Sequence, residues 1–243
     1  MRNSFMIATI AAGLLFASCK KETANDSGPG SGNSNNVAKI KTETGDNGTT
    51  TYKYDATGRL ISEEYANGGK TTYEYQSNTV SQKYFNPAGV NTNTYNYELN
   101  ADGLEIKETR PSQPQFLETK IYNADKQVIK MIALGNGQTD VMDYFYSNGN
   151  CDSIRTSTNG QWTSTIKRTF YTDKPNNLDQ GNYGLNFHGS DWKNLIKTEQ
   201  YFFNDGSTNN LVTWTYEFDA TGKPTKQTST QGANIEIIYL TYQ

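Results

Sequence analysis

From residue 37 to residue 243, the chain consists of short runs in which apolar and polar residues alternate, separated by turns of a few residues. Side chains two positions apart point to the same face of a strand, so this alternation predicts strands with one buried face. The turns leave no room for crossover helices, and neighbouring strands must therefore run antiparallel. Strands are predicted at residues 49–54, 59–65, 70–75, 79–85, 90–99, 104–110, 115–122, 127–134, 139–146, 152–158, 162–171, 210–218, 224–230 and 235–242.

The predicted buried face is mostly aromatic. The chain contains 17 Tyr and 10 Phe, although only 34% of its residues are hydrophobic. Same-face pairs such as Tyr52 with Tyr54 and Tyr73 with Tyr75 recur every 21 to 25 residues, which indicates one hairpin per repeat. We therefore expect residues 37–243 to form a single all-β domain. It would be an antiparallel β-meander of successive hairpins in a large curved or barrel-like sheet with a tyrosine-rich interior.

One turn sequence occurs several times. YKYDATGRL at residues 52–60 returns as YEFDATGKP at residues 216–224, and related tetrapeptides begin at Asn86 and Asn100. Asp or Asn at the first position accepts a backbone hydrogen bond, and Gly at the fourth position supplies the positive φ of a G1 bulge. The residues assigned to these structural turns are Asp55, Gly58, Gly89, Gly103, Asp219 and Gly222. Because the turn already uses the carboxylate oxygen, neither aspartate is expected to be catalytic.

A degenerate copy of this turn lies at residues 123–126, where Lys126 stands in the glycine position. A positive φ strains any residue that has a Cβ atom. We therefore expect a different type of turn at this point.

The N-terminal segment has the features of an export signal. Arg2 precedes an apolar run from Phe5 to Phe16 that is too short to span a membrane. The run leads into LFASC, which resembles the lipobox of bacterial lipoproteins, with Phe16 where Leu, Val or Ile is preferred. We expect residues 1–18 to be a lipoprotein signal peptide and Cys19 to carry lipid; the alternative is an ordinary signal peptide with a cysteine near its cleavage site.

Residues 19–36 are predicted to be the lipidated cysteine and a flexible tether, because the segment after Cys19 is polar and rich in Gly, Ser and Asn. Lys20 follows the cysteine directly, where an acidic residue would signal retention in the inner membrane. We therefore expect an outer-membrane protein of the cell envelope whose first partner is the membrane, through its N-terminal lipid anchor. The face on which the domain lies, periplasmic or external, is left open.

The repeated phrase also carries a family resemblance. The segment Tyr52 to Leu60 resembles the YD repeat of Rhs-type envelope and toxin-shell proteins, and the other copies keep the aromatic residue, the Asn or Asp and the Gly. The order of lipobox, polar tether and Tyr-rich meander resembles a family of bacterial lipoproteins with a porin-like β fold. This resemblance covers residues 37–243 and implies an architecture rather than an activity.

A membrane pore is not expected from this sequence. Membrane-spanning strands need about 9–11 residues and an apolar outer band, and each lipid-facing Lys costs about 2–4 kcal/mol at the midplane. The predicted strands are mostly six to eight residues long, and the face opposite the Tyr pairs carries Thr, Lys, Glu and Asn. We expect the sheet to be soluble rather than membrane-spanning.

Charge and motifs exclude several classes of function. The net charge of −3 is evenly spread without a basic stripe, so no nucleic acid partner is expected. With one His and no metal or nucleotide motif, neither a metal nor a cofactor is predicted, and we do not expect an enzyme. The alternative is an envelope hydrolase that uses strand-face carboxylates, such as Glu63 with Glu64 or Asp140 with Asp143.

The internal cysteine is a weak candidate for catalysis. Cys151 opens a predicted strand, and the one histidine of the chain, His188, lies far from it in sequence. A nucleophilic Cys needs a base beside it. We expect Cys151 to be a small packed side chain.

Two tryptophans are candidates for binding. Trp162 lies beside an Asn-Gly turn, and Trp192 lies in the long segment 173–194, which is rich in Gly and Asn and shows no alternation. Ser190 is predicted to cap one helical turn there, presenting Trp192, Leu195 and Ile196. Because aromatic rings in loops stack on sugars or bind partners, we expect a binding or structural module with a glycan, a polymer or another envelope protein as partner. The alternative is that both rings fold back over the end of the sheet; Trp214 is expected in the core.

Overall fold

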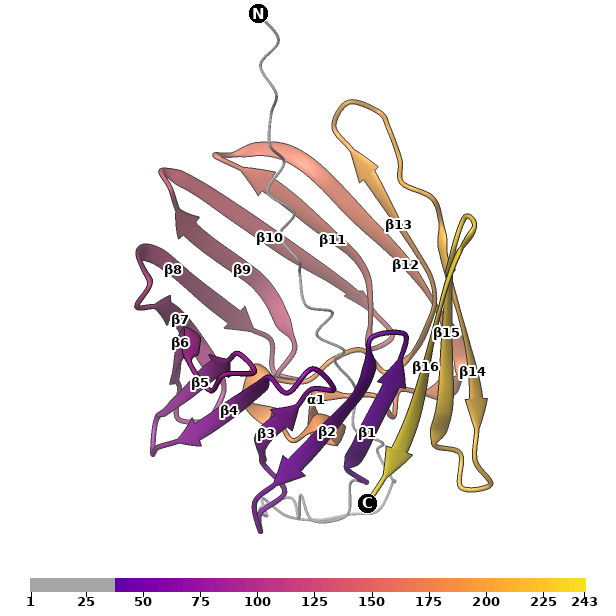
Figure 1. Ribbon diagram of the computed structural model, residues 1–243. Helices are drawn as coiled ribbons and strands as arrows, with labels where there is room; N and C mark the ends of the chain where they lie inside the picture. The colour runs from indigo at the N-terminus through magenta and orange to yellow at the C-terminus, as the bar shows by residue number, and fades with distance from the viewer. Residues whose placement is uncertain (1–37) are drawn as a thin grey trace, which may run out of the picture.

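The computed structural model describes residues 38–243 and shows a closed barrel of 16 antiparallel strands (Figure 1). Each strand pairs with its neighbours in sequence, and β1 pairs with β16 to close the barrel. The predicted signal peptide, the predicted lipidation site Cys19 and the predicted tether lie outside the described residues. The elements are β1 (Ile40–Gly45), β2 (Gly48–Tyr54), β3 (Leu60–Glu64), β4 (Lys70–Tyr75), β5 (Thr79–Phe85), β6 (Asn91–Leu99), β7 (Glu105–Arg110), β8 (Gln113–Tyr122), β9 (Val128–Gly135), β10 (Gln138–Ser147), β11 (Asn150–Thr158), β12 (Gln161–Pro175), α1 (Gln180–Tyr183), η2 (Asn186–His188), β13 (Asn194–Phe203), β14 (Val212–Phe218), β15 (Pro224–Gln231) and β16 (Asn234–Tyr242).

The all-β antiparallel architecture predicted from the sequence is confirmed, and the sheet is fully closed. Strands β1 and β13 were not predicted. Several strands are also longer than their predicted ranges: β8 and β10 have 10 residues in place of eight, and β12 has 15 in place of ten. Most of the additional residues are polar, and some of them, such as Gln161 and Pro175, pair with neighbouring strands, which alternation alone does not reveal.

The predicted hairpin turns form as expected. Gly58, Gly89, Gly103 and Gly222 have φ between 75° and 81°, and each donates its N–H to the carbonyl of the first turn residue. Asp55 Oδ1 accepts hydrogen bonds from the N–H groups of Thr57 and Arg59. These contacts account for the repeated phrase as a structural turn.

The expectation of a different turn at residues 123–126 is wrong. Lys126 has a φ of 62° and donates its N–H to Asn123, as the glycines do in the other copies. The Asn123 side chain accepts from the N–H groups of Asp125 and Gln127, and the Lys126 carbonyl accepts from Ser190 N–H. These bonds hold Lys126 in a conformation that its side chain alone disfavours.

The segment between β12 and β13, residues 176–193, crosses one end of the barrel, and we name it the plug (Figure 1). Its helix α1 is capped by Asp179, which accepts from Asn182 N–H, and Gly184 ends the helix in the left-handed conformation. The predicted helical turn after Ser190 does not form. Leu195 and Ile196 belong to β13 instead, because Ile196 pairs with Phe170 of β12.

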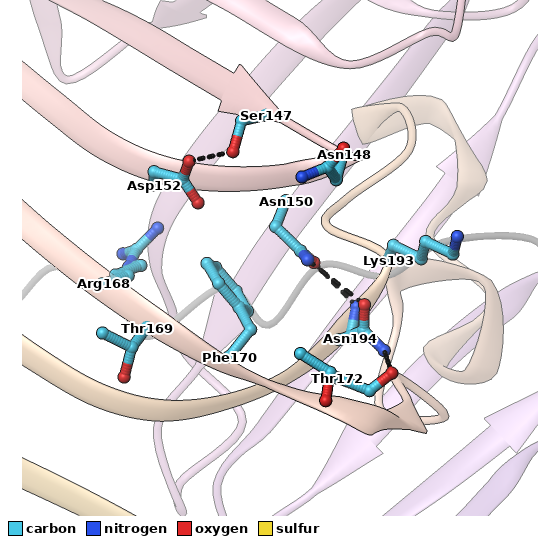
Figure 2. A pocket seen from close by; sticks show the side chains of 10 residues that line it. All are labelled: Ser147, Asn148, Asn150, Asp152, Arg168, Thr169, Phe170, Thr172, Lys193 and Asn194. Atoms are coloured by element: carbon cyan, nitrogen blue, oxygen red, sulfur yellow. Dashed lines mark hydrogen bonds between the residues drawn. The ribbon is translucent and has the colours of Figure 1, made fainter.

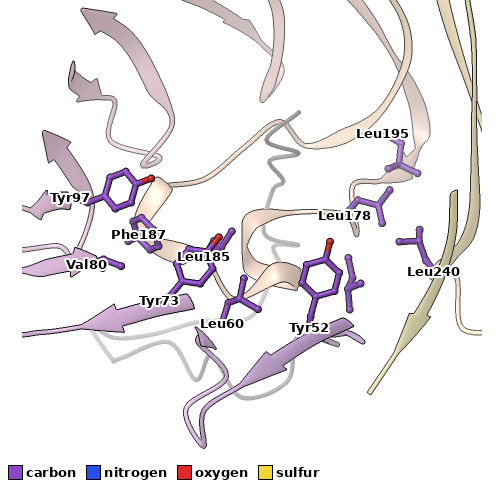
Figure 3. Packing of buried hydrophobic residues seen from close by; sticks show 11 residues of the cluster. Tyr52, Leu60, Tyr73, Val80, Tyr97, Leu178, Leu185, Phe187, Leu195 and Leu240 are labelled. Atoms are coloured by element: carbon purple, nitrogen blue, oxygen red, sulfur yellow. The ribbon is translucent and has the colours of Figure 1, made fainter. Parts of the chain in front are cut away.

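The main hydrophobic cluster lies between the plug and the barrel wall (Figure 3). A barrel of this many strands is too wide for its own inward side chains to fill. Leu178, Leu185 and Phe187 of the plug are buried against the rings of Tyr52 and Tyr97 and their neighbours. The core therefore sits at the plugged end, and none of residues 38–243 crosses the opposite end, which we call the open end.

The outer face of the barrel carries ion pairs between neighbouring strands. Lys53 with Glu64 and Lys130 with Asp143 are two examples, with N–O distances of 2.5 and 3.0 Å. Further pairs of this kind are Glu74 with Lys83, Glu98 with Lys107 and Glu217 with Lys226. Within residues 38–243, the helices are too short and too polar to cross a membrane.

Candidate binding site on the inner wall

Four inward-facing side chains near the open end form a group that we name the aromatic shelf: Tyr84, Tyr95, Arg110 and Phe116. The Tyr84 and Tyr95 rings meet edge to face, with centroids 5.3 Å apart. The Arg110 guanidinium lies 4.8 Å from the Tyr95 centroid and 3.6 Å from the Phe116 centroid. Cation–π contacts hold the charge between the rings. All members of the shelf are half-buried, so their outer edges face the interior of the barrel.

Below the shelf, β7 and β8 bring Glu105, Glu108, Glu118 and Lys120 together in an acidic cluster. Glu108 and Glu118 are directly opposite in the β7–β8 pairing. Arg110 of the shelf donates from Nε to Glu108 Oε1 over 2.7 Å, which links the two groups. Lys120 Nζ lies 2.8 Å from Glu105 and 3.5 Å from Glu118. The cluster thus continues from the shelf toward the plug.

The three carboxylates of the cluster offer oxygen atoms within 4.8 Å of one another, and oxygen ligands of this type suit Mg²⁺ or Ca²⁺. Lys120 already supplies a positive charge within hydrogen-bond distance of Glu105. The cluster therefore provides its own counter-ion, and the donor set alone does not define a metal centre.

The carboxyl groups of the cluster differ in acidity. Burial raises the pKa of Glu118 to about 7 against the opposing effect of Lys120, and burial also raises the pKa of Glu108. For Glu105, burial alone would raise the pKa, but Lys120 and His188 outweigh it and lower the pKa to about 2. Glu105 is therefore ionised at neutral pH, whereas Glu118 is partly protonated.

The plug closes the lower side of this site. His188 of η2 contacts Glu105 with a distance of 2.6 Å between Nδ1 and Oε2, and its ring packs on Phe187 and Tyr97. Burial lowers the pKa of His188, so the neutral ring holds the plug against β7. Sequence reasoning missed this site. One signal for it was present, since Lys120 with Tyr122 takes the place of a Tyr pair in the repeat.

The structure does not bring the two candidate tryptophans together. Trp192 is 9% exposed, packs near Phe170 and lies 4.7 Å below the Arg168 guanidinium, inside the barrel. Trp162 is 36% exposed on the outer face of β12, where its Nε1–H donates to Thr165. Trp214 is buried, as expected. Ligand binding by Trp162 stays a prediction, and no shared groove contains both rings.

The predicted hydrolytic carboxylates are also separated. Glu63 faces inward, where Tyr73 donates to it over 2.5 Å, whereas Glu64 pairs with Lys53 on the outer face. Asp140 and Asp143 likewise lie on opposite faces, because Asp143 pairs with the outer Lys130 and Asp140 accepts from inward Thr158.

Cys151 is the free cysteine of the described residues and is fully buried. Burial raises its pKa to about 11, and it belongs to a cluster with Ile154 and Trp192, whereas His188 pairs with Glu105. The expectation of a small packed side chain is confirmed.

Fold and site together define a plugged, 16-stranded antiparallel barrel with an aromatic and charged inner wall. The sequence profile of the RHS repeat family matches residues 35–70 and 54–79, which cover the first hairpins and confirm the YD-repeat resemblance there. No curated protein sequence matches the chain significantly.

Solved structures with the same fold come from Bacteroides. A porin-like protein from Bacteroides uniformis has 18% identity and a TM-score of 0.58, covering 83% of this chain and 91% of that protein. A porin-like protein from Bacteroides vulgatus has 14% identity and a TM-score of 0.59, covering 84% of this chain and 99% of that protein. At this identity, the similarity concerns the fold, and it confirms the expected porin-like architecture.

Proposed function

We propose that the chain is a lipid-anchored protein of the cell envelope that acts as a binding module and takes a glycan or related polymer into the barrel through its open end. The observation that carries this proposal is the aromatic shelf, with half-exposed rings near the mouth of the barrel. The RHS repeat match and the porin-like fold support an envelope protein.

The chemistry of the shelf suits a sugar. Aromatic rings stack against the apolar face of a pyranose, and a few well-placed polar groups fix its orientation. The Tyr84 and Tyr95 hydroxyls and the Arg110 guanidinium supply such groups beside the rings. Glu108 and Glu118 below them can accept hydrogen bonds from sugar hydroxyls.

The outer face supports a barrel placed in water beside the membrane rather than across it. The cross-strand ion pairs lie where lipid would contact a membrane barrel, and charged side chains at that depth are costly. β8, β10 and β12 are long enough to span, but β1 to β5 and β7 have only five to seven residues, so strand length and the outer charges both argue against insertion. In this proposal, Cys19 provides the attachment.

The binding proposal is tested with a glycan array probed with the full chain purified in detergent. We expect saturable binding that falls at least tenfold in Tyr95→Ala/Phe116→Ala, because that variant removes two rings of the shelf. Tyr239→Ala is the matched control, since this ring is 52% exposed on the outer face. Binding that is unchanged in the double variant, or no binding at all, would contradict the proposal.

The anchor is tested separately. Metabolic labelling with palmitate is expected to mark the wild-type protein and not Cys19→Ala, and label that survives the substitution would remove the lipid anchor from the proposal.

The alternative of an envelope hydrolase is distinguished on the same glycans. The partly protonated Glu118 near ionised Glu105 is the observation that favours it, because glycoside hydrolysis pairs an acid with a carboxylate. Glycan turnover that is lost in Glu118→Gln would establish a hydrolase, whereas binding without turnover supports the binding module.

A further inference from the structure

A second site lies in the barrel wall near the plugged end, where two neighbouring strands separate. β11 and β12 pair from Ser153 with Lys167 toward the open end. On the other side of this point, Asn150 of β11 is no longer paired with β12, and Phe170 of β12 pairs only with β13. The gap between the strands forms a cavity of about 430 Å³, which we name the seam pocket (Figure 2).

Two hydrogen bonds between Asn150 and Asn194 fix the base of the seam pocket. Asn150 Nδ2 donates to Asn194 Oδ1 over 3.1 Å, and Asn194 N–H donates to Asn150 Oδ1 over 2.9 Å. The Asn194 side chain also donates to the carbonyl oxygens of Thr172 and Lys174. Through these bonds, Asn194, the first residue of β13, connects the separated strands β11 and β12. The side chains at the base of the pocket are therefore held in place.

One wall of the seam pocket holds a positive charge with a free donor. The Arg168 side chain is only 10% exposed; its Nε donates to Glu199 over 2.6 Å, and its guanidinium lies over Trp192. Its Nη1 atom is buried and has no hydrogen-bond partner within residues 38–243. Leaving such a donor unsatisfied costs free energy, and Arg168 is among the residues that line the pocket.

The other side chains around the cavity are polar and of mixed type. Asp152, which accepts from Ser147, lies opposite the Phe170 ring, and Asn148 points its amide toward the same space (Figure 2). Among residues 38–243, no hydrogen bond occupies the Asn148 amide. Hydrogen-bond donors, the acceptor carboxylate of Asp152 and the aromatic ring of Phe170 therefore line the same cavity.

The charges in the seam pocket balance, and this decides the class of ligand. Arg168 is paired with Glu199, and the lining further contains one carboxylate, Asp152, and one ammonium group, Lys193. An anion would meet the Asp152 carboxylate and a cation would meet the guanidinium, whereas neutral hydroxyl groups can accept from Arg168 and donate to Asp152. The volume lies within the range of about 300–1,000 Å³ that is usual for small-ligand sites.

From these contacts we propose that the seam pocket binds one neutral sugar unit, with the sugar hydroxyls held by Arg168, Asp152 and Asn148 and a ring face packed on Phe170. This site is separate from the aromatic shelf and does not depend on binding there.

The test is a titration of the full chain in detergent with glucose, galactose and N-acetylglucosamine, followed by ligand-observed NMR, with phosphate and citrate as anionic comparators. At least one sugar is expected to bind saturably. Asp152→Ala and Asn148→Gly should each weaken binding at least fivefold; the glycine retains the positive φ of 50° that Asn148 adopts. Asp143→Ala, on the outer face and remote from the pocket, is the matched control, and thermal unfolding verifies that each variant is folded.

The titrations are repeated in the shelf variant Tyr95→Ala/Phe116→Ala, which removes binding at the shelf, so that the sugar binding that remains reports the seam pocket alone. Absence of saturable sugar binding, binding that is equal in the wild type and both pocket variants, or binding of only the anions would overturn the proposal.

Discussion

At the scale of single residues, the repeated turn uses the side chain of its first residue, Asp or Asn, and the backbone conformation of its glycine. Asp55 Oδ1 accepts from Thr57 and Arg59, and Oδ2 pairs with the Arg59 guanidinium over 2.7 Å. Asn86 makes the same backbone bonds without a charge in an equivalent turn. The carboxylate therefore adds the ion pair with Arg59 and a hydrogen bond from the Thr57 hydroxyl, which an amide oxygen can also accept.

Asp55→Asn is accordingly expected to change the free energy of unfolding by less than about 1 kcal/mol, since exposed ion pairs contribute little. Gly222→Ala should cost more, about 1–2 kcal/mol, because its φ of 81° is strained for alanine although nothing lies within 4 Å of the added Cβ. Urea unfolding measures both. A larger loss in Asp55→Asn than in Gly222→Ala would reverse the assignment of roles.

A second residue-scale prediction concerns Glu118. Because its folded-state pKa of about 7 lies above the ordinary carboxyl value, the folded protein binds this proton more tightly than the unfolded chain. The contribution of Glu118 to stability therefore becomes more favourable as the pH falls from about 7 to about 4.5.

The Glu118→Gln variant should lose this dependence of stability on pH. His188, whose pKa is lowered, acts in the opposite direction in both proteins, so the difference between their unfolding curves from pH 5 to pH 8 isolates Glu118. Parallel stability profiles for wild type and variant would show that Glu118 titrates normally.

At the scale of elements, the plug depends on close backbone approach to the wall. A Cβ atom on Gly184 would lie 2.7 Å from both the Gly58 carbonyl oxygen and the Leu60 nitrogen, where Leu60 N–H now donates to the Gly184 carbonyl. The hydrophobic cluster under the plug is thus positioned by the β2–β3 turn.

Gly184→Ala should therefore displace the plug and expose it to protease, with a greater loss of stability than Gly222→Ala, which has the same backbone strain and open space. Limited proteolysis and urea unfolding are the measurements. Equal protease resistance in the two variants would show that the plug tolerates the contact.

Some of the strands could be predicted from the sequence alone, and others could not. Strands with alternating aromatic residues were predictable because one face is buried along their length. β1 was missed because Ile40 is its one large apolar residue, and β13 because inward Glu199 interrupts its apolar positions. The shelf and the acidic cluster were not predictable, since inward charges become plausible only when the width of the barrel and the position of the plug are known.

At the scale of the whole molecule, closure depends on the β1–β16 pairing. Thr42 and Thr241 are paired across it, and their hydroxyl oxygens lie 2.7 Å apart. Nearby, Ile40 and Leu240 are buried on the inner side. Closure removes both edge strands, which would otherwise present unpaired backbone groups to other chains.

A disulfide can test this closure. Thr42→Cys/Thr241→Cys is expected to crosslink under mild oxidation and to stabilise the barrel by up to about 4 kcal/mol, because the bond links segments far apart in the chain. Thr42→Cys/Thr228→Cys, whose second cysteine lies on β15, should remain reduced. Mass spectrometry detects the bond, and its absence in the first variant would mean that the barrel opens at this pair.

The contacts before β1 show at which end the chain enters the barrel. Ala38 accepts from the side chain of Asn182 over 2.8 Å, and Lys39 Nζ donates to the Gly181 carbonyl over 2.5 Å, so the chain joins the barrel beside the plug. If Cys19 carries lipid, the tether attaches at the plugged end, and the mouth lies at the end of the barrel away from this attachment. A ligand would then approach from the solvent side, with the shelf as the first inner surface it meets.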